Sequence, residues 1–189
     1  MTQKAAAEIL KMAPSTLSNC LHRVITRVRS GHTIRGLVTL GAVEIAYCKG
    51  RKYVTIIYDL DCSHVVWVGR GLGRETIDRF FNESLSEHQR LKSKWASCDR
   101  GRAYTKAIQH HCPNATLVID CFHGVKALNE ALDERPLTNA VGEGINRLLK
   151  IVKIRASGFR GLEPFADLIF LTIGDLDIPA RIPSDLRTL

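Results

Sequence analysis

Two carboxylates of the 189-residue chain, Asp99 and Glu143, stand where they could hold divalent metal ions. Asp99 ends a short strand-like run, and Glu143 stands at the head of an amphipathic helix within residues 139–159. Carboxylates brought together on a sheet and an adjoining helix can bind Mg²⁺ or Mn²⁺, because these hard cations prefer oxygen ligands. A pair of such ions stabilises the attacking and leaving oxygens of a phosphodiester. The pattern is therefore typical of a two-metal nuclease or strand-transferase, although an aspartate at a strand end more often caps a turn.

The helix that carries Glu143 is also basic. Apolar residues at helical spacing line one of its sides, namely Ile145, Leu148, Leu149 and Val152. Four cations line the rest: Arg147, Lys150, Lys153 and Arg155. On charge pattern alone, a solvated helix with i,i+4 ion pairs is the simpler interpretation. The formal net charge of +8 for the whole chain favours a nucleic acid or another anionic partner.

The N-terminal residues 3–29 predict two helices joined by a turn at residues 11–14, with Ser15 as the N-cap of the second helix. Two helices around a tight turn favour the back half of a helix-turn-helix, whose second helix enters the major groove of DNA. Its candidate DNA-binding residues are Arg23, Arg27 and Arg29. Because a complete unit needs a helix before these two, we expect a partial helix-turn-helix over residues 1–30; a helical remnant that packs on the next domain is the alternative. The packed face of the first helix is expected at Ala5, Ala6, Ile9 and Leu10.

The middle of the chain predicts a mixed α/β sheet. Enrichment in β-branched and aromatic residues predicts an antiparallel meander of three strands over residues 37–48, 53–60 and 64–68. Helices and strands then alternate: helix 75–85, strand 91–98, helix 104–110, strand 115–119 and helix 122–132. Acidic residues stand where strands end, and ligands gather at the carboxyl ends of strands in α/β sheets. From Pro164 onward we expect irregular structure, apolar enough to pack over residues 165–173 and loosely attached over residues 175–189.

Several classes of protein are disfavoured by the composition. Six cysteines occur without any C-x-x-C pair, which indicates neither a zinc ribbon nor a disulfide framework and favours a reduced, cytoplasmic setting. No apolar run is long enough to span a bilayer, so we expect no membrane partner. The pair His110-His111 is a weak metal signal that more often marks an exposed helix end.

Four runs of sequence resemble transposases of the ISL-three group of bacterial insertion sequences: GAVEIAYCKGRKYVTIIYDLD, VVWVGRGLGRETIDRFF, CDRGRAYTKAIQHHCPNATLVIDCFHGVKALNEALDE and TNAVGEGINRLLKIVKIRASGFRGLEPF. The resemblance covers roughly residues 37–166, and the helical start resembles the helix-turn-helix of that family. It implies a DDE transposase with a ribonuclease-H-like core, which uses Mg²⁺ or Mn²⁺ to cut and join DNA at the terminal repeats of the element. A homo-oligomeric assembly is left open.

The resemblance also assigns roles to individual residues. Asp99 corresponds to the second catalytic, metal-binding carboxylate of the family, and Glu143 corresponds to the third. The run that contains Asp120 and His123 matches a family signature, which we expect to lie behind the metal ligands or near DNA.

The first catalytic aspartate of the family is absent, because Val43 stands in its place. Valine cannot bind a cation. Glu44 follows it, but successive side chains of a strand point to opposite faces, so Glu44 cannot simply substitute. A hairpin that closes around residues 50–51 puts Asp59 on the side of Glu44 as well, which makes rescue by Asp59 unexpected.

A second departure is a missing segment. The family carries a long helical stretch before the glutamate helix, whereas here residues 132–136 join the two helices directly. We therefore expect a ribonuclease-H-like core over residues 37–174 with an internal deletion near 133–137, followed by an irregular tail over residues 175–189. Together these departures predict a transposase with impaired catalysis. The alternatives are a non-catalytic DNA-binding remnant and a poorly folded relic.

Overall fold

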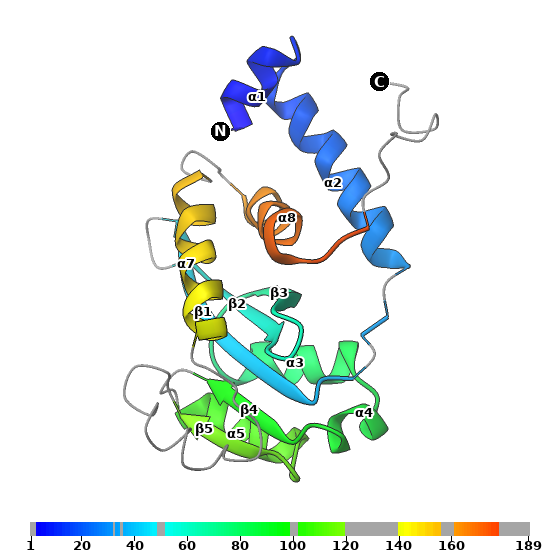
Figure 1. Ribbon diagram of the computed structural model, residues 1–189, viewed down its shortest axis with the longest axis vertical. Coiled ribbons are helices and arrows are strands. Elements are labelled where there is room, and N and C mark those ends of the chain that lie inside the picture. The colour runs from blue at the N-terminus through cyan, green and yellow to red at the C-terminus, as the bar shows by residue number, and fades with distance from the viewer. Residues whose placement is uncertain are drawn as a thin grey trace. The chain divides into compact units, whose positions relative to one another are not determined.

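The computed structural model describes residues 3–31, 33–34, 36–48, 52–98, 102–119, 140–155 and 161–177 (Figure 1). The chain divides into two compact units. The helical unit consists of Met1–Thr33 with Leu148–Leu189, and the sheet unit is Ile34–Arg147. No helix within the described ranges is long and apolar enough to cross a membrane.

Five strands and three described helices make up the sheet unit. The strands are β1 (Thr39–Cys48), β2 (Lys52–Asp59), β3 (His64–Arg70), β4 (Trp95–Cys98) and β5 (Thr116–Ile119). The helices are α3 (Arg74–Ser84), α4 (Glu87–Leu91) and α5 (Arg102–His111). A further helix, α7 (Ala140–Arg155), begins in the sheet unit and ends in the helical unit, which also contains α1 (Gln3–Ile9), α2 (Pro14–Ser30) and α8 (Leu162–Ile173).

The sheet is mixed and has the strand order β3-β2-β1-β4-β5. The first three strands form the predicted antiparallel meander, since β1 pairs with β2 and β2 with β3 in opposite directions. Strands β4 and β5 then add parallel to β1 on its other side. Parallel neighbours need a crossover connection, and α5 supplies it between β4 and β5. The mixed α/β sheet predicted from the sequence is therefore confirmed.

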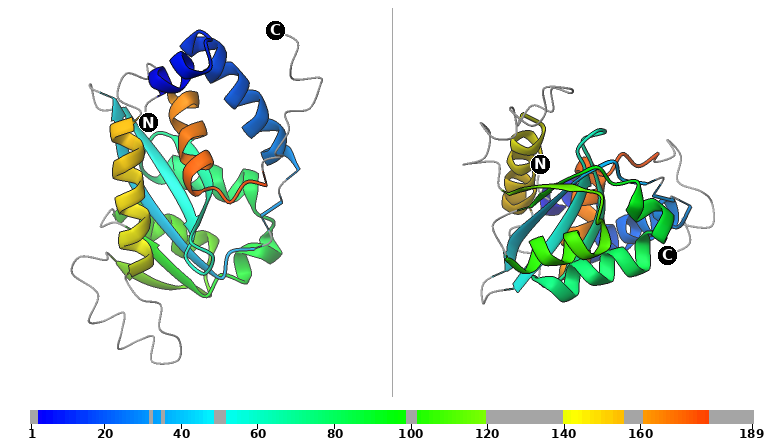
Figure 2. Two further views of the ribbon diagram at one scale, coloured as in Figure 1. Left: turned by 45° about the horizontal axis from the view of Figure 1, so that its top comes forward. Right: turned by 90° about the horizontal axis from the view of Figure 1, so that it is seen from below.

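One face of this sheet is covered by α3 and α5, which lie side by side (Figure 2). The apolar stripe of α3 buries Ile77, Phe80 and Phe81. These side chains belong to the same buried cluster as Tyr104, Ala107 and Ile108 of α5 and as the sheet residues Leu40, Ala42, Ile57, Ala96 and Cys98. Burial of each large apolar side chain contributes about 1.5–3 kcal/mol, so this cluster holds helices and sheet together.

Several local predictions are corrected by the structure. The predicted strand at residues 91–98 is shorter, because Ser86 forms a capping box with Gln89 and starts the short helix α4 before β4 begins at Trp95. The irregular segment expected from Pro164 is instead the regular helix α8, since its apolar residues recur at helical spacing and Pro164 lies in the first turn, where proline is tolerated.

The N-terminal helices also differ in detail from the prediction. Helix α2 starts at Pro14 with Ala13 as its N-cap, not at Ser15, because proline at the first helical position is already set in the helical φ. In α1 the buried residue is Ala7, whereas Ile9 and Leu10 are 69% and 55% exposed. The turn between the two helices lies where it was predicted.

Candidate active site

Val43, where the family resemblance places a catalytic aspartate, lies on β1 near the end of the parallel strand β4. The parallel register pairs Gly41 with Ser97 and Ala42 with Cys98, the last residue of β4. Val43 is the next residue along β1, and Asp99 is the next residue in the chain after Cys98. Asp99 itself lies outside the described residues, as do Asp120 and His123.

Val43 stands on the sheet face that points away from α3 and α5. Its antiparallel partner on β2 is Ile56, and Gly41 and Ile45 precede and follow it on the same face. Gly41 is needed there because the Tyr58 ring lies over it: a Cβ at position 41 would come within 2.2 Å of a ring carbon. An apolar, half-buried side chain thus occupies the position at which the family resemblance places a first metal ligand.

Glu44 points to the other face, as predicted, and is bound to the helical layer there. Its Oε1 accepts a hydrogen bond of 3.1 Å from the backbone N–H of Gly73, the N-cap residue of α3. A carboxylate at this place is favourable, because the N-terminus of a helix carries partial positive charge. Gly73 has φ +86°, a backbone conformation that glycine adopts more readily than other residues. Both the glycine and the glutamate are therefore suited to this contact.

Tyr104 of α5 joins the same network from the next helix. Its hydroxyl hydrogen-bonds to Glu44 and lies 2.7 Å from Oγ1 of Thr55, the β2 partner of Glu44. Burial, followed by the neighbouring Glu44 carboxylate, raises the pKa of the Tyr104 hydroxyl. Glu44 therefore connects β1 to both covering helices, which makes it unsuited to replace Val43 as a metal ligand.

Asp59 is no substitute either. The register pairs it with Leu40, on the Glu44 side of the sheet, as the sequence predicted. Its Oδ1 accepts hydrogen bonds from the backbone N–H groups of Asp61 and Cys62, at 2.8 and 3.3 Å. The side chain therefore shapes the β2–β3 turn. Within the described residues, no group of three or more His, Cys, Asp or Glu side chains could hold a metal ion.

Glu143 lies in the first turn of α7. The structure describes only the backbone in this turn, and it describes side chains after Glu143. The predicted amphipathic character of this helix is confirmed at three of its four apolar positions: Ile145, Leu149 and Val152 are buried, while Leu148 is 38% exposed. All four predicted DNA-binding cations of α7, Arg147, Lys150, Lys153 and Arg155, are exposed.

With this geometry in hand, the comparison with protein families is decisive. A profile of the ISL-three group, described as a transposase, matches residues 40–135, just over half of the chain. The chain belongs to the ISL-three transposase family. The matched segment begins on β1 and includes β2 to β5, so the mixed sheet is the ribonuclease-H-like core that the resemblance implies.

Curated relatives are transposases of insertion sequence elements. The chain is 36% identical to the transposase for insertion sequence element IS1001 of Bordetella parapertussis over 92 residues, which cover 49% of this chain and 22% of that protein. It is 26% identical to the transposase for IS1557 of Mycobacterium tuberculosis (strain CDC 1551 / Oshkosh) over 133 residues, which cover 70% and 30%. The chain thus spans between a fifth and a third of the length of these relatives.

Two solved structures show a weaker likeness. The catalytic core domain of BIV integrase is 12% identical at a TM-score of 0.48, covering 71% of this chain and 82% of that one. A chain of the simian T-cell lymphotropic virus intasome in complex with PP2A regulatory subunit B56 gamma is 14% identical at a TM-score of 0.43, covering 79% and 53%.

The arginines predicted to bind DNA on α2 of this family member differ in their surroundings. Arg23 and Arg27 are exposed. The guanidinium of Arg29 instead lies over the Phe170 ring of α8, with its Cζ atom 3.7 Å from the ring centroid, and the buried carboxylate of Asp167 lies close enough to act on its charge. A cation held over an aromatic face in this way stabilises helix packing.

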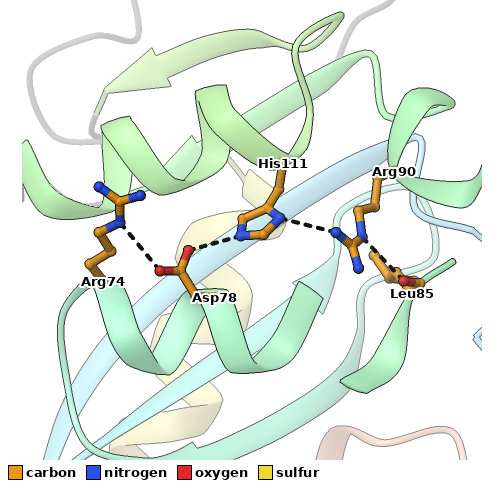
Figure 3. Close-up of polar contacts among 5 residues, drawn as sticks. All are labelled: Arg74, Asp78, Leu85, Arg90 and His111. Atoms are coloured by element: carbon orange, nitrogen blue, oxygen red, sulfur yellow. Dashed lines mark hydrogen bonds and ion pairs between the residues drawn. The ribbon is translucent and has the colours of Figure 1, made fainter. Parts of the chain in front are cut away.

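A polar network between α3, α4 and α5, which no pattern in the sequence predicted, lines a groove of about 530 Å³ (Figure 3). Asp78 accepts from Nε of Arg74 at 3.2 Å and contacts Nε2 of His111 at 2.8 Å. Arg90 places a guanidinium nitrogen 3.2 Å from Nδ1 of His111 and donates from Nε to the Leu85 carbonyl. The interpretation of the histidine pair as an exposed helix end is wrong for His111, whose side chain is only 7% exposed.

This network fixes the protonation state of His111. Arginine can only donate, so Nδ1 of His111 must accept and Nε2 must carry the proton that goes to Asp78. Burial and the nearby Arg90 charge lower the pKa of the ring against the opposing effect of Asp78. The imidazole is neutral with both nitrogens engaged, so it connects helices and does not serve as a catalytic base.

We predict that Glu44→Ala destabilises the ISL-three family core by about 1–3 kcal/mol, because the Gly73 N–H and the Tyr104 hydroxyl lose their carboxylate partner in a partly buried site. Glu44→Gln keeps an oxygen acceptor and should lose less. Urea unfolding measures the difference. The matched control is Asp59→Ala, which removes a carboxylate from an accessible turn; an equal or larger loss in that variant would contradict the role given to Glu44.

We also predict that the free energy of unfolding falls as the pH is lowered from about 6.5, the pKa of an unfolded histidine. The folded-state pKa of His111 is lowered, so the unfolded chain takes up this proton first and gains stability relative to the folded chain. The contribution of Asp78, whose pKa is lowered by His111 and Arg74 against the effect of burial, is lost only below about 3.8.

Urea titrations at about pH 7 and about pH 5 test this assignment. His111→Gln should flatten the dependence on pH, because glutamine can still donate to Asp78 but takes up no proton. The control is His88→Gln, which removes an exposed histidine that is not among the groups acting on His111 and should change the slope less than His111→Gln does. The assignment would be refuted if the free energy of unfolding depended on pH equally in the unmodified chain and in His111→Gln.

Proposed function

We propose that this chain derives from a metal-dependent DNA transposase that cuts and joins DNA at the ends of an insertion sequence, and that its catalysis is impaired at Val43. The observation that carries the proposal is the register of β1 and β4. Gly41 and Ser97 pair on one face and Ala42 and Cys98 on the other. Extended by one residue beyond Cys98, this alternation would put position 99 on the face of Val43, and positions 43 and 99 would then be the two strand-borne ligand positions.

A divalent ion fits these residues only in part. Asp99 and Glu143 would supply carboxylate oxygens for one Mg²⁺ or Mn²⁺, whose remaining positions water can fill. A second ion needs a carboxylate that bridges both, and Val43 offers none. The two residues that could have compensated, Glu44 and Asp59, are engaged on the opposite face. We therefore derive no strand-transfer step through metal for the unmodified chain.

A second candidate function is DNA binding without catalysis, which the exposed cations of α7 favour. Arg147, Lys150, Lys153 and Arg155 follow Glu143 within the same helix, and all are exposed. Together with Arg23, Arg27 and Arg29 they would neutralise phosphates, so affinity should fall steeply with salt concentration. The partner in both candidate functions is DNA in the bacterial cytoplasm. Two copies of the chain would assemble there on the terminal repeats of the insertion sequence.

The proposed internal deletion near residues 133–137 falls outside the described residues. The match to the family ends at residue 135, next to that junction. This agreement supports a core that has lost a family segment between β5 and α7.

Nicking of supercoiled DNA in Mn²⁺ tests the proposed function. We expect no nicking by the unmodified chain and Mn²⁺-dependent nicking by Val43→Asp, because the aspartate restores a third carboxylate. The double variant Val43→Asp with Asp99→Ala should not nick the DNA. The matched control is Ile45→Asp, which places the same charge on the same strand and face, two residues away from the site.

Two outcomes would contradict the proposal. Nicking by the unmodified chain that is lost in Asp99→Ala would mean that another carboxylate already fills the first position. A folded Val43→Asp variant without nicking, while it still binds DNA, would mean that the core lost its chemistry elsewhere, and the DNA-binding function would stand.

A further inference from the structure

One side of α7 exposes three large apolar side chains, which we call the outer stripe. They are Leu148, Ile151 and Ile154, with exposed fractions of 38%, 37% and 72%. Apart from α7, no helix in the described part of the chain exposes more than one large apolar residue. Single apolar residues are ordinary on a protein surface, whereas a continuous stripe of them marks a site of interaction.

The outer stripe is separate from the side of α7 that packs inside the protein. At about 100° per residue, the three residues of the stripe span about 120° of the helix surface, centred on Ile151. The buried apolar residues of α7 are centred close to Ile145, about 120° away from Ile151. The helix therefore has two apolar sides, and only one of them is used in its own fold.

The four exposed cations of α7 divide between two directions by residue type. Arg147 and Arg155 lie within about 40° of Ile151, among the residues of the outer stripe. Lys150 and Lys153 lie about 100° and about 160° away from it. Arginine is enriched in protein–protein interfaces and lysine is depleted there, since a guanidinium is weakly hydrated and binds carboxylates through two hydrogen bonds. The side of the outer stripe thus has the composition of a protein interface.

The spacing of the residues on this side suits a helix as the partner. Leu148, Ile151 and Arg155 follow one another at i, i+3 and i+7, the spacing of a seam along which a second helix packs. Gly144 continues the seam by one turn toward the start of α7. Among the described residues, no atom beyond its neighbours along the helix lies within 4 Å of the place that a Cβ would take at Gly144. A partner helix can therefore approach α7 closely at this glycine.

The charges on this side define the chemistry of the partner. Arg147 and Arg155 lie about 12 Å apart along the helix axis, at a rise of about 1.5 Å per residue. No acidic residue follows Glu143 in α7. A second copy of the chain that presented the same stripe would be repelled, because like charges would meet across the seam. A helix with two carboxylates at a similar separation would instead pair with both arginines.

We propose that the outer stripe of α7 binds an acidic amphipathic helix of another protein. The three aliphatic side chains of the stripe pack into the apolar seam of that helix, and Arg147 and Arg155 bind its carboxylates. Lys150 and Lys153 stay available for phosphate, so α7 serves two kinds of partner on two sides. The inference goes beyond the proposed function and does not rest on it.

Binding of synthetic helical peptides to the full chain, followed by fluorescence anisotropy, tests this surface. The acidic probe has about three heptads, with leucine at the a and d positions and glutamate beside them. A basic probe carries lysine in place of every glutamate, and a polar probe carries serine in place of every leucine. The chain should bind the acidic probe at least about 10-fold more tightly than either of the others, because both the seam and the charges contribute.

Variants of the chain assign the binding to the outer stripe. Ile151→Ala and Ile154→Ala should each weaken binding of the acidic probe by about 10- to 50-fold, since about three aliphatic carbons leave the interface. The melting temperature should stay unchanged, because both positions are exposed and alanine favours helix more than isoleucine does. Arg155→Gln should also weaken binding. The matched control is Lys153→Gln, which removes the same charge from the other side of the same helix and should leave binding of the acidic probe unchanged.

Four results would overturn the proposal. The first is a chain that does not bind the acidic probe. The second is equal weakening by Lys153→Gln and Arg155→Gln, since attraction between net charges would then explain the binding. The third is a dimer of the unmodified chain in sedimentation that Ile151→Ala converts to a monomer, since a second copy would then cover the stripe. The fourth is loss of DNA binding in Ile151→Ala, which would assign the stripe to DNA. The nicking experiment tests the proposed function separately, because none of these variants changes position 43.

Discussion

The architecture of this chain depends on the position of β1 between an antiparallel and a parallel neighbour. The alternation of side chains along a strand gives β1 two faces with different tasks. One face carries Leu40, Ala42 and Glu44 toward α3 and α5, where Glu44 binds the start of α3. The other face carries Val43 at the point where β4 ends. A shift of one residue in either register would exchange these faces, so the same pairing fixes the core and the site.

This arrangement explains how one substitution can remove chemistry and leave the fold in place. A valine on a half-buried strand face suits strand propensity and costs the sheet nothing. The carboxylates closest along the chain, Glu44 and Asp59, cannot move to the vacant position without breaking the α3 contact or the β2–β3 turn. Their removal from those contacts would cost stability, whereas under the proposed function a ligand lost at position 43 would cost only metal affinity. Under the proposed function, the expected result is a folded protein whose metal site lacks one ligand.

Local patterns in the sequence predicted the sheet well and the polar contacts poorly. The meander of β1 to β3 and the side on which Glu44 and Asp59 lie follow from β-branched enrichment and from an alternation of period two, which are local properties. The role of His111 depends on Asp78 and Arg90 from two other helices, and no spacing along the chain encodes that meeting.

Helix α8 was missed for a related reason. Irregular structure was expected from Pro164 onward, although proline fits the first turn of a helix, and the partners of α8 on α2 are about 145 positions away in the sequence. Similarly, Ser15 is a good N-cap by residue type, but Pro14 determines where α2 begins. Assignments to Asp99, Asp120 and His123 came from the family resemblance and stay predictions, since these residues lie outside the described ranges.

In the proposed function, position 43 is the absent member of a metal site whose other ligands remain. Titration of Mn²⁺ into the unmodified chain and into Val43→Asp, followed by the electron paramagnetic resonance signal of free Mn²⁺, measures this directly. The account predicts that Val43→Asp binds Mn²⁺ at least about 10-fold more tightly, because even a partner behind a metal ligand is worth about 10- to 100-fold in affinity, and that Asp99→Ala abolishes the gain. Equal affinity of the two proteins for Mn²⁺, with both folded, would contradict it.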